Sequence, residues 1–104
     1  MTEYSKLKLT LSGPVARIWL DQPDTRNAFD DVVIAELTQA FIEAGVMPQV
    51  RAVVLGASGP AFCAGADLNW MRRMADYTRS DNIADAEKLA DMLRTIAECP
   101  KPTI

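Results

Sequence analysis

The sequence predicts an α/β fold. Three observations indicate it: residues 7–12 and 15–20 alternate apolar with polar side chains, residues 50–55 form a short run that is apolar except for Arg51, and apolar residues recur at helical spacing between these segments. Alternation is typical of a half-buried strand, and a short continuous apolar run indicates a strand covered on both faces. Strands and helices that follow one another in one short chain favour a sheet packed against helices.

The first two strands are predicted to form an antiparallel hairpin. Leucines at positions 7, 9 and 11 alternate with polar residues, and Gly13-Pro14 marks a turn before the alternation resumes at Val15. A polar loop, residues 21–27, follows and contains a proline. Two alternating runs joined by a glycine-containing turn are the usual pattern of a hairpin.

A helix is predicted after this loop, because apolar residues recur at positions 33, 37, 40, 41 and 44. We expect Asp30 or Asp31 to cap its N-terminus and Gly45 to suit its C-terminus. The strand Val50 to Leu55 comes next. Two glycines and a proline in residues 56–60 then predict a turn.

Two further helices are predicted. Asp67 caps the first, Leu68 to Ala75, and Ser80 or Asp81 starts the second, which runs to about Glu98 ahead of Pro100. The apolar stripe of the second helix is expected at Ile83, Ala86, Ala90, Leu93 and Ala97. Thr103-Ile104 has the character of the start of another strand, so the predicted order is β-β-α-β-α-α and a beginning strand.

Four small residues, Cys63-Ala64-Gly65-Ala66, lie between the strand at 50–55 and the helix that Asp67 opens. Side chains this small let a ligand approach the backbone closely. Free amide N–H groups at a helix start bind anions. Directed at a carbonyl oxygen they would form an oxyanion hole, in which one donor typically lowers the barrier by about 2.7–4 kcal/mol.

Three segments of the sequence, this one included, resemble those of a known protein family. The stretch Phe62-Cys63-Ala64-Gly65-Ala66-Asp67-Leu68 resembles the signature of the enoyl-CoA hydratase/isomerase (crotonase) superfamily, and Arg26-Asn27-Ala28-Phe29 and Pro100-Lys101-Pro102-Thr103-Ile104 resemble two further segments in family order. Gly65 to Met71 looks most like the methylglutaconyl-CoA hydratase branch. The resemblance implies a crotonase-like spiral of ββα units. Residues 1–104 would then be the N-terminal part of one such domain, cut at the start of a strand.

The resemblance also implies roles for single residues. The Ala66 amide would be the first oxyanion donor, and Gly65 would enable the turn. The implied CoA-binding positions are Arg26, Ala28, Phe29, Ala64, Ala66, Asp67 and Leu68, and the implied acyl-pocket positions are Leu68 and Met71. The second donor and the catalytic glutamates would lie beyond Ile104. Each role has a structural alternative: a solvated charge for Arg26, helix packing for Ala28 and Phe29, core packing for Met71, and helix capping alone for Asp67.

The implied activity is that of an acyl-CoA enzyme, first of all an enoyl-CoA hydratase that adds water syn to a 2-enoyl-CoA thioester through an enolate-like state. Its substrate could be branched, such as methylglutaconyl-CoA. The alternatives are an isomerase or another crotonase-type reaction, a noncatalytic CoA-binding or assembly module, and a domain whose small-residue turn only packs a helix. Coenzyme A enters as part of the substrate with no prosthetic group, and a homo-oligomer, a trimer or hexamer, is expected. Residues 1–104 alone are expected to lack hydratase activity.

The composition excludes several other classes of function. The chain has 104 residues and a net charge of −3, so it is one domain at most and has no basic footprint for nucleic acid. It contains no histidine, which excludes Ser-His-Asp and Cys-His nucleophile systems within this chain and leaves Cys63 as a packing residue. Cys63 and Cys99 are expected to be free thiols, and no metal site is indicated. No apolar stretch near 18 residues is present, which predicts a cytoplasmic protein.

The remaining charged and aromatic residues are predicted to have structural roles and no catalytic role. Four glutamates, at positions 36, 43, 87 and 98, are predicted to be solvated on helix surfaces, as is the pair Arg72-Arg73. Trp70 is predicted to lie in the core or in an oligomer contact.

Overall fold

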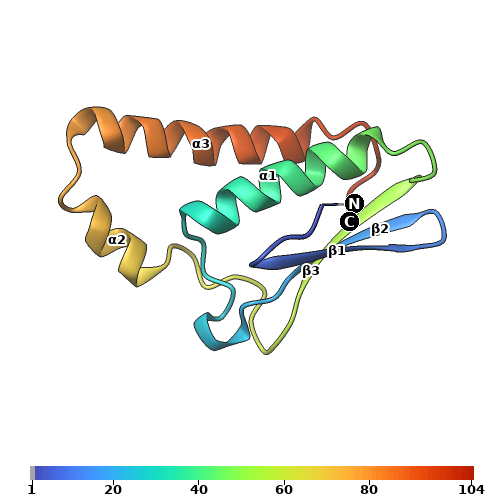
Figure 1. Cartoon of the computed structure of the whole chain (residues 1–104), viewed down its shortest axis with the longest axis horizontal. Coiled ribbons are helices and arrows are strands. Elements are labelled where there is room, and N and C mark those ends of the chain that lie inside the picture. Colours follow the sequence, from blue (N-terminus) through green and yellow to red (C-terminus); the bar gives the residue numbers. More distant parts are fainter. Residues whose placement is uncertain (1) are drawn as a thin grey trace.

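The computed structural model describes residues 2–104, and Figure 1 shows their arrangement. The elements are β1 (Leu7–Ser12), β2 (Val15–Leu20), the 3-10 helix η1 (Pro23–Thr25), α1 (Asp31–Val46), β3 (Ala52–Ala57), α2 (Leu68–Met74) and α3 (Arg79–Ala97). Their order confirms the predicted α/β class.

The strands form one sheet in the order β1-β2-β3. β1 and β2 are antiparallel, with Leu7 opposite Leu20, whereas β2 and β3 are parallel. On the other edge of β3, Thr103 bridges Val53 in parallel, and the Ile104 amide donates to the Val53 carbonyl at 2.9 Å. The last residues therefore begin to pair as a strand, as predicted.

One face of the sheet packs against α1, and α3 lies alongside α1 on the side away from the sheet (Figure 1). Inward-facing residues of the strands and the apolar stripe of α1 make up most of the core. Its buried apolar residues are Leu7, Leu9, Ala16, Ile18, Leu20, Val33, Ile34, Leu37, Ala40, Phe41, Ala44, Val50, Val53, Trp70 and Met92. The predicted helical spacing of α1 thus matches the face that it buries.

The third strand lies two residues later than predicted, so Gly56 and Ala57 belong to β3 and not to a turn. Gly56 stands beside Trp19 of β2, and a Cβ atom on Gly56 would overlap the indole ring. This glycine is needed because it leaves room for Trp19. The turn follows the strand and contains Gly59, which has a φ of +85°.

Helix ends differ from the predictions in two places. Gly45 does not cap α1, because the helix continues through Val46 and Gly45 is buried, with Pro100 Cδ 3.1 Å from the place of a Cβ atom. α3 begins at Arg79, just before the predicted start at Ser80 or Asp81, and Thr78 caps it by accepting a hydrogen bond from the Asp81 amide at 3.1 Å. Asp30 caps α1, as one of the two predicted alternatives, through the Val33 amide at 2.8 Å.

The predicted apolar stripe of α3 is wrong. Met92 is 1% exposed and is buried against the core, with Leu89 and Ile96 half-buried beside it, whereas Ile83 is 48% and Leu93 56% exposed. One residue along a helix corresponds to about 100° of rotation, so two apolar stripes lie side by side on α3. Packing against α1 selects the stripe that contains Met92.

Two glutamates of α1 hold the N-terminal segment and are not merely solvated. Glu36 accepts hydrogen bonds from the Lys6 amide at 2.7 Å and the Ser5 amide at 3.1 Å, and Glu43 accepts from the Tyr4 hydroxyl at 2.8 Å. Burial and the hydrogen bond to Glu43 raise the pKa of Tyr4 to about 12. Burial also acts to raise the pKa of Glu43, but hydrogen bonds from Thr2 and Tyr4 outweigh it and lower that pKa below its ordinary value.

The described chain is elongated. Its extents are 45 × 28 × 21 Å, and its radius of gyration of 14.2 Å exceeds the roughly 13 Å expected of a compact chain of this length. Figure 1 shows the reason: α2 and the first turns of α3 extend beyond the end of the sheet. Within residues 2–104, no helix has the length and apolar character needed to cross a bilayer.

Candidate functional site

Two loops that are far apart in the sequence run side by side at the end of the sheet. The Ala64 amide donates to the Arg26 carbonyl at 3.0 Å, the Phe29 amide to the Gly65 carbonyl at 2.7 Å, and the Asp67 amide to the Phe29 carbonyl at 2.6 Å. Phe29 and Ala66 consequently form a parallel β-bridge. The two segments that carry the sequence motifs are thus joined through their backbones.

Asn27 fastens this pair of loops to the turn after β3. It is 1% exposed, its Oδ1 accepts from the Gln22 amide at 2.8 Å, and its Nδ2 donates to the carbonyls of Ser58 and Ala61 at 2.8 and 2.9 Å. Its φ of +55° lies in the left-handed region, which asparagine tolerates better than most residues. The sequence pattern included Asn27 without indicating this role, because two of its three side-chain partners, Ser58 and Ala61, are more than thirty residues away.

The direction of the Ala66 amide follows from its neighbours. The Gly65 carbonyl is directed at the Phe29 amide, and no peptide bond of the described chain is cis. Carbonyl and N–H of a planar trans peptide point in opposite directions, so the Ala66 N–H is directed away from Phe29. Among residues 2–104 this N–H has no hydrogen-bond partner, and Ala66 is exposed.

Gly65 provides the backbone conformation that this arrangement needs. Its φ is +89°, and a Cβ atom placed on it would meet no atom within 4 Å. The requirement for glycine is therefore conformational and not spatial. The half-buried Cys63 lies in the same turn, where its Sγ accepts from the Gly65 amide at 3.4 Å.

Asp67 caps α2, as predicted. Its Oδ1 accepts from the Trp70 amide at 3.0 Å. Trp70 is 5% exposed and belongs to the core, which confirms one of the two alternatives predicted for it. The cap and the buried indole fix the start of α2 relative to the small-residue turn.

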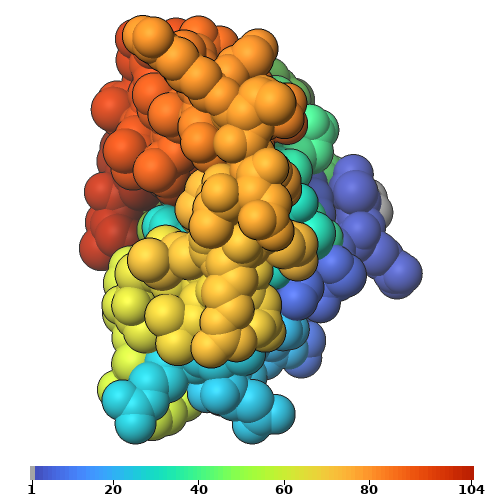
Figure 2. All heavy atoms as spheres, turned by 90° about the vertical axis from the view of Figure 1, so that its left-hand side faces the viewer, coloured from blue at the N-terminus to red at the C-terminus, as the bar shows by residue number. Residues whose placement is uncertain are grey.

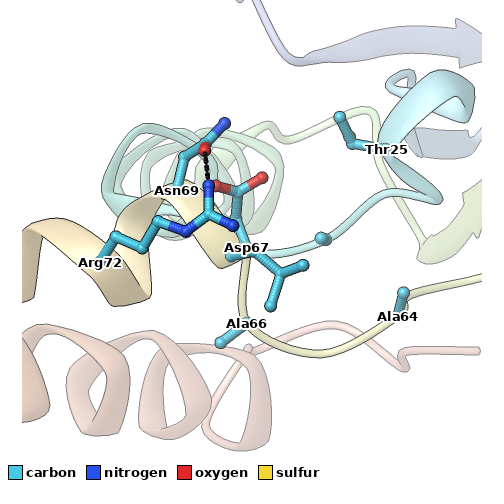
Figure 3. A pocket seen from close by; sticks show the side chains of 8 residues that line it. Thr25, Ala64, Ala66, Asp67, Asn69 and Arg72 are labelled. Carbon is cyan, nitrogen blue, oxygen red and sulfur yellow. Dashed lines mark hydrogen bonds between the residues drawn. The ribbon is translucent and has the colours of Figure 1, made fainter.

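An open cavity of about 480 Å³ lies against these loops (Figure 3). It is lined by Thr25, Ala28, Ala64, Ala66, Asp67, Leu68, Asn69 and Arg72. Its volume is within the range of small-molecule sites, roughly 300–1,000 Å³. Figure 2 views the face that carries it, where residues 62–74 (yellow) run between the loop around residue 25 (cyan) and the start of α3 (orange).

The structure brings together five of the nine residues that the sequence singled out: Ala28, Ala64, Ala66, Asp67 and Leu68. Arg26, Gly65 and Phe29 belong to the paired backbones beside the cavity but do not line it, and Met71 lies outside it and is exposed. No metal-binding cluster occurs within the described part of the chain.

Thr25, Asn69 and Arg72 also line the cavity and are not among the site residues predicted from the sequence. Asn69 and Arg72 are three positions apart and so lie on one side of α2, next to the small-residue turn, a signal that helical spacing could have provided. The two adjacent arginines differ: Arg73 pairs with Asp31 at 3.0 Å, while Arg72 Nη1 lies 3.4 Å from Asn69 Oδ1. The expectation that both are simply solvated is therefore incomplete.

Known proteins resemble this chain in sequence and in structure. Residues 10–104 match the sequence model of the enoyl-CoA hydratase/isomerase family. A Mycobacterium tuberculosis protein named "Probable enoyl-CoA hydratase EchA14" is 35% identical over 104 residues, which are 100% of this chain and 40% of that protein.

Solved structures agree with the sequence matches. The crystal structure of an enoyl-CoA hydratase from Shewanella pealeana is 42% identical with a TM-score of 0.94, over 97% of this chain and 38% of that one. An enoyl-CoA hydratase/isomerase from Xanthobacter autotrophicus is 31% identical with a TM-score of 0.90, over the same shares of the two chains, 97% and 38%. The chain thus spans about two fifths of the length of the relatives it matches.

Proposed function

The chain belongs to the enoyl-CoA hydratase/isomerase family, and we propose that its complete gene product is an acyl-CoA enzyme, specifically an enoyl-CoA hydratase. One observation carries the proposal: the Ala66 amide lacks a partner among residues 2–104 and belongs to a residue that lines an open cavity. Its conformation is held by Gly65 and by the bridge to Phe29.

In the proposed reaction, water adds across the C2–C3 double bond of a 2-enoyl thioester. Negative charge then develops on the thioester oxygen, and a fixed N–H donor stabilises it without reorganisation at that moment. The Ala66 amide would supply one such donor, worth about 2.7–4 kcal/mol. General acid and base groups, which typically add about 10²–10⁴-fold, would come from outside residues 1–104.

The cavity beside this amide suits the coenzyme A part of the substrate. Small side chains at Ala28, Ala64 and Ala66 leave space for the adenine and the pantetheine arm, and Leu68 adds apolar surface. Arg26 and Phe29 would act from the adjoining loop. Leu68 and Met71, both exposed and apolar, are proposed to line the acyl pocket.

A branched substrate such as methylglutaconyl-CoA, an intermediate of leucine degradation, is our specific candidate. It is supported by the stretch Gly65 to Met71. An isomerase would use the same donor with different acid and base groups, so it remains the second candidate. We also propose that the protein assembles as a trimer or hexamer, which light scattering of the purified protein would measure.

Hydration is tested with the purified complete gene product and 2-enoyl-CoA thioesters, including crotonyl-CoA and methylglutaconyl-CoA. Loss of the absorbance of the conjugated thioester reports turnover, and calorimetric titration with CoA reports binding. Turnover of either substrate supports the enzyme. Binding without turnover of any thioester would instead indicate a noncatalytic CoA-binding module. If neither turnover nor CoA binding is observed, the small-residue turn would serve only to pack a helix against a strand.

A further inference from the structure

We propose that Arg72 binds a phosphate group of the substrate's coenzyme A nucleotide. This inference rests on the proposed function. Arg72 is the one cationic residue among the eight that line the cavity, and it lies on α2, where Figure 3 shows its side chain beside that of Asn69. The remaining lining residues are small, apolar or neutral except for Asp67.

The charge of Arg72 is not taken up inside the described chain. Within residues 2–104, no carboxylate oxygen lies within 4.0 Å of its guanidinium nitrogens, whereas the adjacent Arg73 is paired with Asp31 at 3.0 Å. Among residues 2–104, the one hydrogen bond of the Arg72 side chain is the long contact of 3.4 Å to Asn69 Oδ1. A guanidinium has five donors in a planar fork that fits phosphate oxygens, so most of its donors remain available.

Asn69 adds to the same site. Its Oδ1 accepts from Arg72, and its Nδ2 makes no hydrogen bond within residues 2–104. An anion beside the guanidinium could therefore receive donors from both side chains. Charge-assisted hydrogen bonds of this kind are about twice as strong as neutral ones.

Asp67 limits where an anion can bind. Its carboxylate lines the same cavity, and its Oδ1 is engaged by the Trp70 amide. Like charges repel, so a phosphate gains only if it contacts the guanidinium directly. Figure 3 shows the Asp67 carboxylate on the same side of the cavity as Arg72 and Asn69, so the phosphate is proposed to lie directly against the guanidinium, and the small-residue side would take uncharged parts of the ligand.

Arg26, the cation that the sequence indicated, is less well placed for direct contact. It does not line the cavity, and its carbonyl is used by the Ala64 amide at 3.0 Å. We therefore assign the direct phosphate contact to Arg72 and a longer-range electrostatic contribution to Arg26.

Calorimetric titration of the complete gene product tests the assignment. Arg72→Gln is compared with Arg73→Gln, the matched control on the next residue, and with Arg26→Gln. Each protein is titrated with CoA, with 3′-dephospho-CoA and with pantetheine, which has no phosphate. We expect Arg72→Gln to weaken CoA binding by about 10- to 100-fold and to leave pantetheine binding unchanged, because a hydrogen bond to a charged group is worth that factor. Arg73→Gln should bind all three ligands like the wild type.

The nucleotide analogue identifies the phosphate. If the loss disappears with 3′-dephospho-CoA, Arg72 binds the 3′-phosphate, and if it persists, Arg72 binds the pyrophosphate; both outcomes support the proposal. Arg72→Lys keeps the positive charge but lacks the planar guanidinium fork, and it should bind CoA more tightly than Arg72→Gln does. This variant shows whether the loss in Arg72→Gln comes from the missing charge and not from misfolding.

Three results would overturn the assignment. They are wild-type CoA affinity in Arg72→Gln, an equal loss for CoA and pantetheine, and a phosphate-dependent loss in Arg26→Gln alone. In each of these cases the proposed function would still hold if the wild-type protein binds CoA. A wild-type protein that binds neither CoA nor pantetheine would defeat both.

Discussion

Gly65 is the residue on which the geometry of the proposed oxyanion donor depends. Its left-handed φ of +89° lets its carbonyl meet the Phe29 amide, and this contact directs the Ala66 N–H to the opposite side. An L side chain in that conformation costs about 1–2 kcal/mol, although no atom stands in its way.

Gly65→Ala in the complete gene product should therefore lower kcat for enoyl-CoA hydration by up to about 100-fold, because a displaced donor stabilises the transition state less well. Steady-state kinetics measures this effect. Gly13→Ala is the matched control: Gly13 also has a positive φ, +58°, and open space around it, but it lies in the β1–β2 turn. Its kcat should not change. Full activity in Gly65→Ala would argue against Ala66 as a donor.

Asn27 is the residue that holds the site to the sheet end. Asn27→Gly preserves the left-handed backbone and removes three hydrogen bonds at a buried position. We expect the free energy of unfolding to fall by about 1–3 kcal/mol, because buried amide and carbonyl groups lose their partners. Urea denaturation measures it.

The neighbouring Arg26 provides the control for Asn27. It has a φ of +53°, and its side chain makes no hydrogen bond within residues 2–104. Arg26→Gly should cost little or slightly stabilise the fold, since glycine relieves the left-handed strain. Equal losses in Asn27→Gly and Arg26→Gly would assign the effect to the backbone and contradict the role of the asparagine side chain.

At the scale of elements, the two adjacent residues Met92 and Leu93 distinguish the two apolar stripes of α3. Met92 is 1% exposed and Leu93 56%. Met92→Ala should lower the free energy of unfolding by about 2–5 kcal/mol, the usual cost of such a core truncation, and Leu93→Ala by much less. Thermal and urea denaturation compare them. A larger loss at Leu93 would restore the stripe predicted from the sequence.

The N-terminal segment is a second element whose attachment is measurable, because its contacts titrate. The pKa of Tyr4 is raised from 10.0 to about 12, so its contribution to stability is complete below pH 10 and is lost as the pH rises through 12. The pKa of Glu43 is lowered from 4.5, so its contribution is present above pH 4.5 and is lost as the pH falls below that value.

We therefore expect the Tyr4–Glu43 contact to stabilise the fold most between about pH 5 and pH 10. Tyr4→Phe removes the hydroxyl and should reduce the alkaline loss of stability between pH 10 and 12. Urea denaturation across this range measures the difference. An identical pH profile in wild type and Tyr4→Phe would contradict the tether.

At the scale of the whole molecule, the described residues would supply only half of the proposed catalytic site. The Ala66 amide is exposed, but none of the glutamates lines the cavity: Glu36 and Glu43 hold the N-terminal segment, and Glu87 and Glu98 are exposed on and after α3. Acid and base groups are needed for hydration, and a donor without them polarises the thioester only.

Residues 1–104 prepared alone should accordingly show no hydration of a 2-enoyl-CoA above the uncatalysed rate. Circular dichroism of the same preparation checks that its helices are formed, and the absorbance of the conjugated thioester reports the reaction. Measurable hydration by this chain would require an acid and a base among its own residues and would contradict the proposed division of roles.

Features that depend on a few neighbouring residues could be predicted from the sequence. The strands at 7–12 and 15–20, the caps at Asp30 and Asp67 and the turn at Gly65 follow from alternation, from side-chain hydrogen bonds to nearby amides and from glycine conformation. The small-residue turn could also be identified from the family segments, because its backbone conformation depends on residues that are adjacent in the sequence.

Features that depend on distant partners were decided by the tertiary structure. The indole ring of Trp19 accounts for the glycine at position 56, because a larger residue would overlap it. Packing against α1 determines which face of α3 is buried, and Glu36 accepts a hydrogen bond from the Lys6 amide of the N-terminal segment. The cavity brings Arg72 to the loop at Thr25, a residue that no local pattern connects with it. A side chain's role at such places depends on what packing brings against it, and that partner is not encoded within the few residues on either side.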